Sequence, residues 1–420
     1  MSVSGGSPRL FAVHDYVHLW VSNLLGDIGS AFATVALSVT AVVFLHASTF
    51  EVAVIAALGN GAYLVLGVPI GVWADRVHPK RLLLIADLSR FVAVATVPVA
   101  YFAHGLTVAQ LMGVAAVTSA ANVTYDVAHT TVLPSLVGRT RVPAASAQLQ
   151  SVDASVRVFG PGLAGQLIAV TAGPVAYIVT AVVHAVSSLS AGSIRAGSQA
   201  QRVERTPFWS SLREGLSYVI GAPLQRTFMF AAATVNFGSG FIAAIQPLFI
   251  LRTLHFSPAE YGLVLSVGGI GGIVGALAGM RIRRWLGEIR AQILCYAAIP
   301  LAFAPTPLAP FLPAPKPVSV AVAEFCISFV IVVAAISSSG IYARMTPPHL
   351  LGRVTAARRT VAVGVIPLGT LIAGALAIFT GYDIALWIGA GIMACSAAVF
   401  AASPIFRMKN LPPQWEYSEA

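Results

Sequence analysis

Long apolar segments alternate with short polar loops along almost the whole chain. Each segment holds roughly 20 residues, the length that crosses a bilayer as an α-helix. A longer polar stretch, from about Arg195 to Gln225, divides the segments into two equal groups. We therefore expect an all-α polytopic membrane protein with about twelve transmembrane helices in two six-helix halves. The expected helix cores are residues 17–45, 52–73, 82–102, 107–132, 148–171 and 174–194, then 226–252, 259–280, 290–310, 317–343, 355–379 and 382–403.

The composition agrees with a membrane protein. Hydrophobic residues occupy 57% of the 420 positions and charged residues only 10%, whereas a soluble domain carries about 25% charged residues. The net charge of +10 comes from cations in the short loops, which indicates membrane orientation and not nucleic-acid binding. The sequence has neither a Gly-x-x-x-x-Gly-Lys-Ser/Thr loop nor cysteines with metal-ligand spacing. We expect no cofactor, no metal site and no nucleic acid; protons are the expected coupling ion, and the lipid bilayer and a small-molecule substrate are the expected partners.

The basic residues also predict the orientation of the chain. Cytoplasmic loops of membrane proteins carry an excess of Lys and Arg. With the N-terminus inside, the outer loops hold little beyond Arg252 and Lys316. Both termini are therefore expected in the cytoplasm. The expected inner cations are Arg76, Lys80, Arg81, Arg139, Arg141, Arg195, Arg202, Arg205, Arg213, Arg281, Arg283, Arg284, Arg344, Arg353, Arg407 and Lys409.

Polar stretches set the expected domain boundaries. The N-terminal half is expected at residues 1–194 and the C-terminal half at 226–403, followed by a cytoplasmic tail at 404–420. The linker, residues 195–225, begins with a Ser-, Gln- and Arg-rich part. It continues with the apolar spacing of a short surface helix from Phe208 to Ile220.

A dense cluster of charge follows the second apolar segment: Gly71-Val-Trp-Ala-Asp75-Arg76-Val-His-Pro-Lys80-Arg81. This spacing resembles the loop between helices 2 and 3 of the major facilitator superfamily of secondary transporters. The resemblance implies two parallel six-helix halves with the substrate site between them. It also implies that Gly71 and Asp75 belong to a conformational latch, in which the carboxylate binds the start of a helix in the other half. The alternative is that Arg76, Lys80 and Arg81 only hold the loop on the cytoplasmic side.

A weak internal repeat supports the division into halves. The sequence from Gly275 to Arg284 follows the eighth segment as the first cluster follows the second, with Gly279 where the first copy has Asp75. The glycine series from Gly268 to Gly279 superficially suggests dinucleotide binding. Because the series lies inside an apolar segment, we expect it to allow close helix packing instead.

The fifth segment contains Gly160-Pro161-Gly162-Leu-Ala164-Gly165. A Gly-Pro pair inside a membrane helix bends it and leaves a backbone carbonyl without its usual partner. The run resembles the antiporter motif of the superfamily's drug exporters, although Ala164 stands where that motif more often has glycine. An ordinary proline kink is the alternative, but the position in the fifth segment favours export.

Two further stretches narrow the resemblance to a branch. One runs from Asn122 to Arg139, and the other runs from Thr346 through Gly352-Arg353 to Gly369. Both look like the actinobacterial exporter branch that includes enterobactin and macrolide efflux proteins. The resemblance implies an integral protein of the bacterial cytoplasmic (inner) membrane, usually a monomer, and it adds Gly352 and Arg353 to the expected latch.

Ionisable side chains inside apolar segments are costly and mark candidate functional sites. Asp27 stands in Gly26-Asp27-Ile28-Gly29 of the first segment, and no cation lies three or four residues away from it. A carboxylate in such a place can exchange a proton near neutral pH. Exporters of this family often carry an acidic residue in this segment, to which proton or cation coupling is attributed. The alternative is that Asp27 has a partner on another helix.

Four further residues complete the expected proton-coupling and substrate site. Asp153 and Arg157 share one helix face, so they form either a self-neutralising pair or a substrate contact. Asp126 lies near the inner end of its segment, where it could also cap the helix or pair with an arginine. Glu324 lies about two turns from the outer end of its segment and could face the cavity or an outer gate.

The third segment carries another charged pair. Asp87 and Arg90 are three residues apart, a spacing that places them on the same face of a helix. We expect them to pair close to the inner surface of the membrane.

Together these features predict a secondary active transporter, not an enzyme, that exports small amphipathic molecules of drug, antibiotic or siderophore type by proton antiport with alternating access. The acids outnumber Arg157 in the expected cavity, which favours cationic or neutral substrates. A metabolite or siderophore importer or uniporter is the alternative within the same fold. A membrane enzyme or sensor would need a nucleophile, base or metal-ligand constellation, and the sequence has no His-Glu-x-x-His, Gly-x-Ser-x-Gly or Cys/His cluster.

Overall fold

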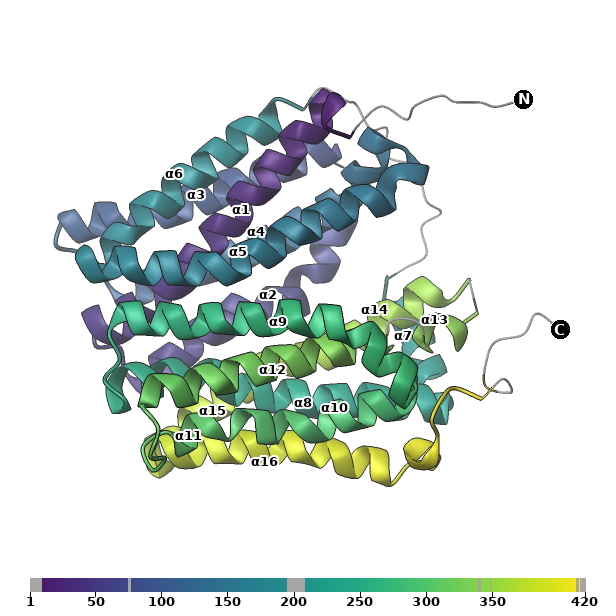
Figure 1. The fold of residues 1–420 in the computed structure, drawn as a ribbon. Coiled ribbons are helices and arrows are strands. Elements are labelled where there is room, and N and C mark those ends of the chain that lie inside the picture. Colours follow the sequence, from purple (N-terminus) through teal and green to yellow (C-terminus); the bar gives the residue numbers. More distant parts are fainter. Residues whose placement is uncertain are drawn as a thin grey trace.

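The computed structural model describes residues 10–74, 77–194, 208–338, 341–347, 349–412 and 415. These residues form helices and connecting loops, without a strand among them (Figure 1). The first part of the chain contains η1 (Leu10–Ala12), α1 (His14–Val39), η2 (Thr40–Phe44), α2 (Thr49–Ala74), α3 (Pro79–Phe102), α4 (Val108–Val137), η3 (Arg139–Arg141), α5 (Val142–Val170) and α6 (Gly173–Gly192).

The second part begins with α7 (Phe208–Gly221), which covers the range where the sequence predicts a short surface helix. The remaining elements are α8 (Pro223–Leu248), η4 (Phe249–Thr253), α9 (Pro258–Leu286), α10 (Glu288–Phe303), α11 (Pro305–Leu308), α12 (Lys316–Ser338), α13 (Ile341–Arg344), α14 (Leu351–Gly364), α15 (Ile366–Thr380), α16 (Tyr382–Ala401) and η5 (Pro404–Arg407).

Ten helical segments in the described part of the chain are long and apolar enough to cross a membrane. The all-α membrane fold is therefore confirmed, and the predicted count of about twelve spans is supported for ten of them. The other two predicted spans form α4 and α5, with 30 and 29 residues, but both helices are too polar to qualify by composition. Polar residues persist in transporter helices that face a water-filled path, and α4 and α5 carry Asp126, Asp153 and Arg157.

Local sequence signals set the helix ends. Ser257 accepts a hydrogen bond from the backbone N–H of Glu260, whose carboxylate accepts one from Ser257 N at 2.8 Å. This capping box fixes the start of α9. Gly381 has a φ of 82°, in the left-handed region open to glycine, and it separates α15 from α16.

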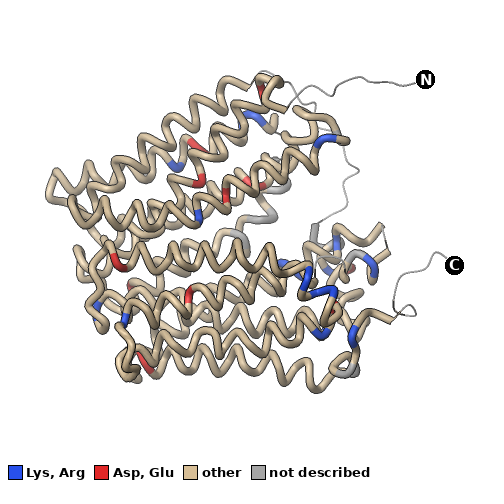
Figure 2. The backbone as a smooth tube through the Cα atoms, in the orientation of Figure 1, with Lys and Arg blue, Asp and Glu red and all other residues tan. Residues whose placement is uncertain are grey.

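The helices lie in two layers, with α1, α3, α4, α5 and α6 in one and α8, α9, α10, α12, α15 and α16 in the other (Figure 1). The layers are joined mainly where α5 packs along α9 and where α2, which packs on α4 of the first layer, also packs along α15. Smaller contacts join α2 to α8 and α14, and α1 to α9. We call the end of the bundle where α1 begins and η5 ends the terminal face, and the opposite end, with the α1–α2 and α8–α9 loops, the distal face. Lys and Arg gather at the terminal face (Figure 2).

Candidate functional site

The antiporter-like sequence of α5 lies in a close contact between the two layers. A Cβ added to Gly165 would meet the carbonyl oxygen of Pro258 and would lie 3.0 Å from Cα of Gly262. Gly262 faces α5 as closely, because a Cβ there would meet the carbonyl oxygen of Pro161. Gly160 of the same sequence packs against α1, where its Cβ would lie 2.7 Å from that of Ala31. The motif therefore allows α5 to approach two helices at once.

The glycines of α9 divide between two neighbours. Gly269 faces α5, where a Cβ would lie 2.7 Å from the carbonyl carbon of Arg157. Gly271 and Gly275 face the backbone of α12 at Phe325 and Phe329. Small residues thus allow α9 to pack closely on both sides, as the sequence predicts.

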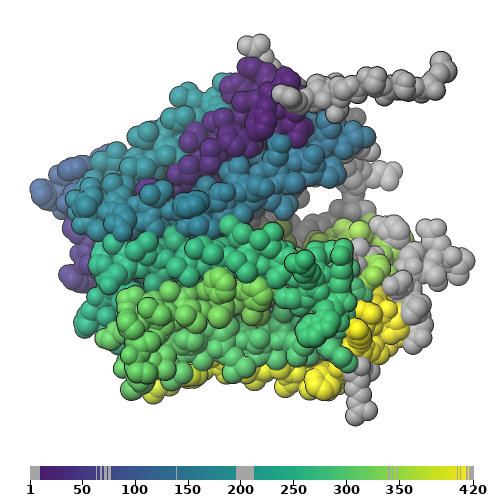
Figure 3. Space-filling model, viewed as in Figure 1, coloured from purple at the N-terminus to yellow at the C-terminus, as the bar shows by residue number. Residues whose placement is uncertain are grey.

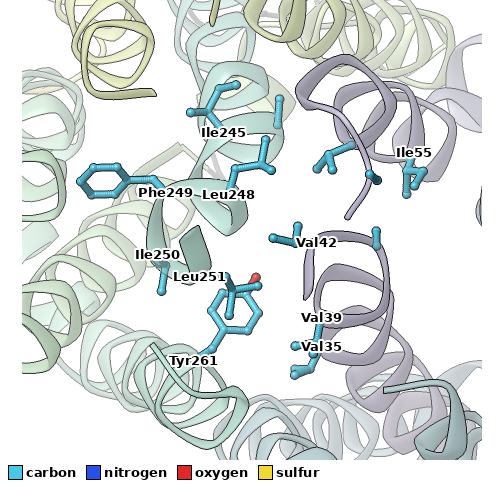
Figure 4. Close-up of a cluster of buried hydrophobic side chains, with 14 of the residues drawn as sticks. Val35, Val39, Val42, Ile55, Ile245, Leu248, Phe249, Ile250, Leu251 and Tyr261 are labelled. Atoms are coloured by element: carbon cyan, nitrogen blue, oxygen red, sulfur yellow. The ribbon is translucent and has the colours of Figure 1, made fainter. Parts of the chain in front are cut away.

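Apolar side chains continue this contact across the distal half of the bundle. In Figure 4, Val35, Val39 and Val42 lie across from Leu248 and Leu251 of the other layer, and all are buried in one cluster. We call this cluster the distal seam. The guanidinium of Arg252 adds two hydrogen bonds across it, from Nη2 to the carbonyl oxygens of Val42 at 3.2 Å and Ala47 at 2.7 Å.

At the terminal face the core divides in two. One buried cluster, with Tyr16, Leu83 and Leu133, belongs only to the first layer. Another, with Phe228 and Phe400, belongs only to the second. Figure 3 shows a hollow between the layers on this side, whereas their surfaces meet at the distal end. A cleft therefore opens toward the terminal face and is closed by the distal seam.

Asp27 lies midway along α1 and is partly buried. Its Oδ2 accepts a hydrogen bond from the side-chain amide of Asn23 at 2.8 Å, so Asp27 has an uncharged partner on its own helix. Asp27 also interacts electrostatically with charged groups on three other helices. Those groups are Arg90 of α3, Asp126 of α4, and Asp153 and Arg157 of α5. The fold thus brings four of the predicted site residues together, and we call Asp27, Asp126, Asp153 and Arg157 the acidic cluster.

Asp153 and Arg157 form the predicted pair. Nε of Arg157 donates to both carboxylate oxygens of Asp153, at 3.1 and 3.0 Å. The two side chains are 44% and 73% exposed, so other protein groups cover little of the pair. The pair is therefore both self-neutralising and exposed.

Glu324 lies apart from the acidic cluster. It extends from α12 toward α8, where its carboxylate accepts a hydrogen bond from Gln246 at 2.5 Å. A Cβ on Gly268 of α9 would lie 3.4 Å from it. Glu324 is thus packed among helices of the second layer, about two turns from the start of α12.

A buried charged network in the first layer was not expected from the sequence. Asp87 and Arg90 do pair, with Nη1 of Arg90 2.9 Å from Oδ1 of Asp87, but the residues are only 0% and 5% exposed. The predicted pair is therefore confirmed and is buried among helices, while its place near the inner surface of the membrane stays a prediction. The i,i+3 spacing reveals the pair, but it does not show which way that helix face points.

The predicted latch residues are only partly visible. Asp75 and Arg76 lie outside the described residues, and Gly71 falls within α2. Lys80 and Arg81 lie in the first turn of α3, at the terminal face. The latch itself stays a prediction.

The corresponding part of the second layer contacts the linker helix. Arg353, in the first turn of α14 after Gly352, forms an ion pair with Glu214 of α7. Close by, Glu288 at the start of α10 pairs with Arg344 and, at 3.5 Å, with Arg283. Glu288 also accepts a hydrogen bond from the backbone of Leu411 at 3.2 Å. These contacts fasten the linker helix and the tail to the second layer.

In the described part of the chain, neither a candidate metal centre nor a distal cavity gathers ionisable side chains as the acidic cluster does. Among the described residues, no group of three His, Cys, Asp or Glu side chains is placed to hold a metal ion. A cavity of about 500 Å³ opens at the distal face, lined by Thr49, Arg252 and Tyr382 among others. None of the described residues that line it is a carboxylate, and the cavity lies at the end opposite the mouth of the cleft.

Comparison with known sequences places the whole chain beside membrane exporters. The profile of one family, described as transmembrane secretion effector, matches residues 7–418. The multidrug efflux pump Tap of Mycolicibacterium fortuitum is 29% identical over 345 residues, covering 79% of this chain and 82% of that protein. Tap of Mycobacterium tuberculosis is 27% identical over 360 residues, covering 82% and 83%.

Comparison with solved structures shows the same fold. A bacterial homologue of the iron transporter ferroportin, in an inward-facing state, superimposes with a TM-score of 0.72 over 92% of this chain and 98% of its own, at 14% identity. The nucleoside transporter NupG gives a TM-score of 0.72 over 94% and 100%, also at 14% identity.

Proposed function

Because the chain belongs to the transmembrane secretion effector family of major facilitator transporters, we propose that it exports small amphipathic molecules, of drug, antibiotic or siderophore type, by proton antiport. The observation that carries the proposal is the acidic cluster, in a bundle whose layers part at one face and are sealed at the other. The relatives named as multidrug efflux pumps support export as the direction.

The distribution of charge supports an orientation. Lys and Arg gather at the terminal face (Figure 2), and cytoplasmic loops carry such an excess. We assign the terminal face to the cytoplasm of a bacterial cell and the protein to the inner membrane, with both termini inside. In this orientation the cleft opens to the cytoplasm, as expected of the inward-open state of an alternating-access cycle.

The acidic cluster sets the expected substrate. Its carboxylates outnumber the guanidinium of Arg157, so a cation enters the cleft more favourably than an anion. A protonated Asp27 and a bound cation exclude one another, because each neutralises the same carboxylate. Substrate binding from the cytoplasm therefore releases a proton, and proton entry from the outside releases the substrate.

Closure of the cleft completes the cycle. The layers would separate at the distal seam while the terminal ends of α5 and α9 come together. Glu324 lies in the second layer on the distal side of the cleft, where it would become reachable from outside during this change. We assign it a second proton-binding role.

Transport in proteoliposomes tests the proposal, with ethidium as a fluorescent amphipathic cation. An imposed pH difference should drive ethidium into the compartment that is more acidic, against its own gradient. Asp27→Asn should abolish this response. The matched control is Asp383→Asn, which removes an exposed acid at the distal start of α16. Ethidium movement that ignores the pH difference would mean uniport or another coupling ion, and movement in the same direction as protons would mean import.

A further inference from the structure

The buried pair of α3 is held by hydrogen bonds from three helices. Arg90 donates to Oδ1 of Asp87, while Ser187 of α6 and Ser22 of α1 donate to Oδ2, at 2.6 and 3.2 Å. Both carboxylate oxygens are therefore occupied. Asp87 acts as a fixed anchor that holds the guanidinium of Arg90 in one place.

Arg90 has more hydrogen-bond donors than this anchor uses. A guanidinium carries five N–H donors. Nε of Arg90 is buried and has no hydrogen-bond partner among the described residues. Leaving a buried donor without an acceptor costs about 1–3 kcal/mol. The ring of Tyr125, whose centroid lies 4.8 Å from Cζ of Arg90, supports the guanidinium by a cation–π contact but offers Nε no acceptor oxygen.

The guanidinium lies against the turn of α1 that carries Asp27. Nη1 of Arg90 would be 3.7 Å from a Cβ built on Gly26, and Arg90 interacts electrostatically with Asp27. The amide of Asn23 engages only Oδ2 of Asp27. Arg90 therefore lies close to Asp27 with a donor that is not used. The Oδ1 atom of Asp27 is not engaged by Asn23.

We propose that Arg90, anchored on Asp87, is a positioning residue for proton exchange at Asp27. This inference rests on the proposed antiport. When the O–H bond of Asp27 breaks, its electron pair stays on the carboxylate and the proton passes to water in the cleft. Arg90 then stabilises the negative charge from the buried side, while the cleft side of Asp27 stays open to a cationic substrate. Without this cation, Asp27 would hold its proton too firmly for a substrate to displace it.

Arg157 does not replace Arg90 in this role. It is paired with Asp153 and 73% exposed, so water and salt screen its charge. Arg90 is buried, so the medium between it and Asp27 is protein and not water. Its lower dielectric constant leaves the interaction between the two charges stronger at a given distance. Charged and titratable groups face Asp27 and Arg90 from every neighbouring helix: Tyr125 and Asp126 of α4, Asp153 and Arg157 of α5, and His184 of α6.

The test reads the protonation of Asp27 directly and needs no transported substrate. Infrared difference spectra in detergent should show a carboxylic acid C=O band that titrates with pH in the wild type and is missing in Asp27→Asn. The double variant Asp87→Asn/Arg90→Gln removes both buried charges together, so that no buried charge is left unpaired. In this variant the midpoint of the Asp27 band should move up by at least about one pH unit. Arg90→Lys should restore most of the wild-type midpoint.

An unchanged midpoint in Asp87→Asn/Arg90→Gln would overturn the role of Arg90. The role would also be overturned if the triple variant Asp27→Asn/Asp87→Asn/Arg90→Gln showed the same shifted band. The band would then belong to a group other than Asp27. If the midpoint shifts but ethidium transport ignores the pH gradient, the role of Arg90 at Asp27 stands and the antiport proposal fails. If antiport works and the midpoint does not move, only this inference fails.

Discussion

Gly165 of α5 and Gly262 of α9 leave no room for a side chain between them, since a Cβ on Gly165 would lie 3.0 Å from Cα of Gly262. The two helices belong to different layers, so this contact is part of the closed distal side. Substituting Gly165 should therefore act on the conformational equilibrium as well as on packing.

Gly165→Ala should slow transport by about tenfold or more, because forcing a methyl group into a filled contact costs about 1–3 kcal/mol. Ethidium flux in proteoliposomes measures the effect. Gly113→Ala in α4 and Gly391→Ala in α16 are matched controls, since a Cβ at either site meets nothing within 4 Å. Equal losses in all three variants would show that helix propensity, and not the contact between layers, explains the result.

Arg252→Gln should weaken the distal seam. The guanidinium donates to two carbonyl oxygens of the other layer, and hydrogen bonds from a charged group contribute about 1.5–3 kcal/mol. We expect labelling of a Val42→Cys reporter by a membrane-impermeant maleimide to rise about tenfold or more. Lys316→Gln removes another cation of the distal face and should leave labelling unchanged. If Arg252→Gln is labelled as slowly as the wild type, apolar packing alone keeps the distal seam closed.

The exposed pair Asp153–Arg157 should set the affinity for charged substrates with little effect on the stability of the protein. Asp153→Asn should weaken ethidium binding and Arg157→Gln should strengthen it, each by up to about tenfold, because the two changes alter the cleft charge in opposite directions. Since the pair is exposed, each change should cost less than about 1 kcal/mol of stability. Fluorescence titration in detergent measures the affinities. Changes of the same sign in both variants would mean that the pair serves geometry and not charge.

Glu288→Gln should destabilise the terminal end of the second layer. Glu288 is 5% exposed and pairs with two partly exposed arginines, and hydrogen bonds to a charged group contribute about 1.5–3 kcal/mol. Glu214→Gln breaks the more exposed pair with Arg353 and should cost less than about 1 kcal/mol. Reaction of a thiol dye with buried Cys295 during heating reports both, in a background with Cys326→Ser and Cys395→Ser. Similar shifts in the two variants would contradict the difference in burial.

The sequence predicts helices better than it predicts which side chains meet. The apolar segments give the helices, and the four-residue spacing of Asp153 and Arg157 gives their pair, because both depend on local periodicity. The approach of Asp27 to α4 and α5 depends on how helices far apart in the chain pack, which no local pattern records. The burial of Asp87 and Arg90 against α1 and α6 depends on the same long-range packing.

Arg252 shows a second limit of the sequence. From the sequence alone, Arg252 is only one of the few cations on the face that otherwise lacks them. In the structure its side chain turns inward and bonds the backbone of the other layer. Composition records how many charges a loop carries, but it does not record which of them point back into the protein.

The distal seam has a further consequence for how this protein can evolve. Its contacts are mostly apolar and contribute to the folded state, yet the proposed transport cycle would require that they come apart in every turnover. Substitutions that fill the seam more completely would raise resistance to heat and lower turnover. The same side chains thus affect both heat tolerance and the rate of transport, so a substitution that improves one is expected to reduce the other.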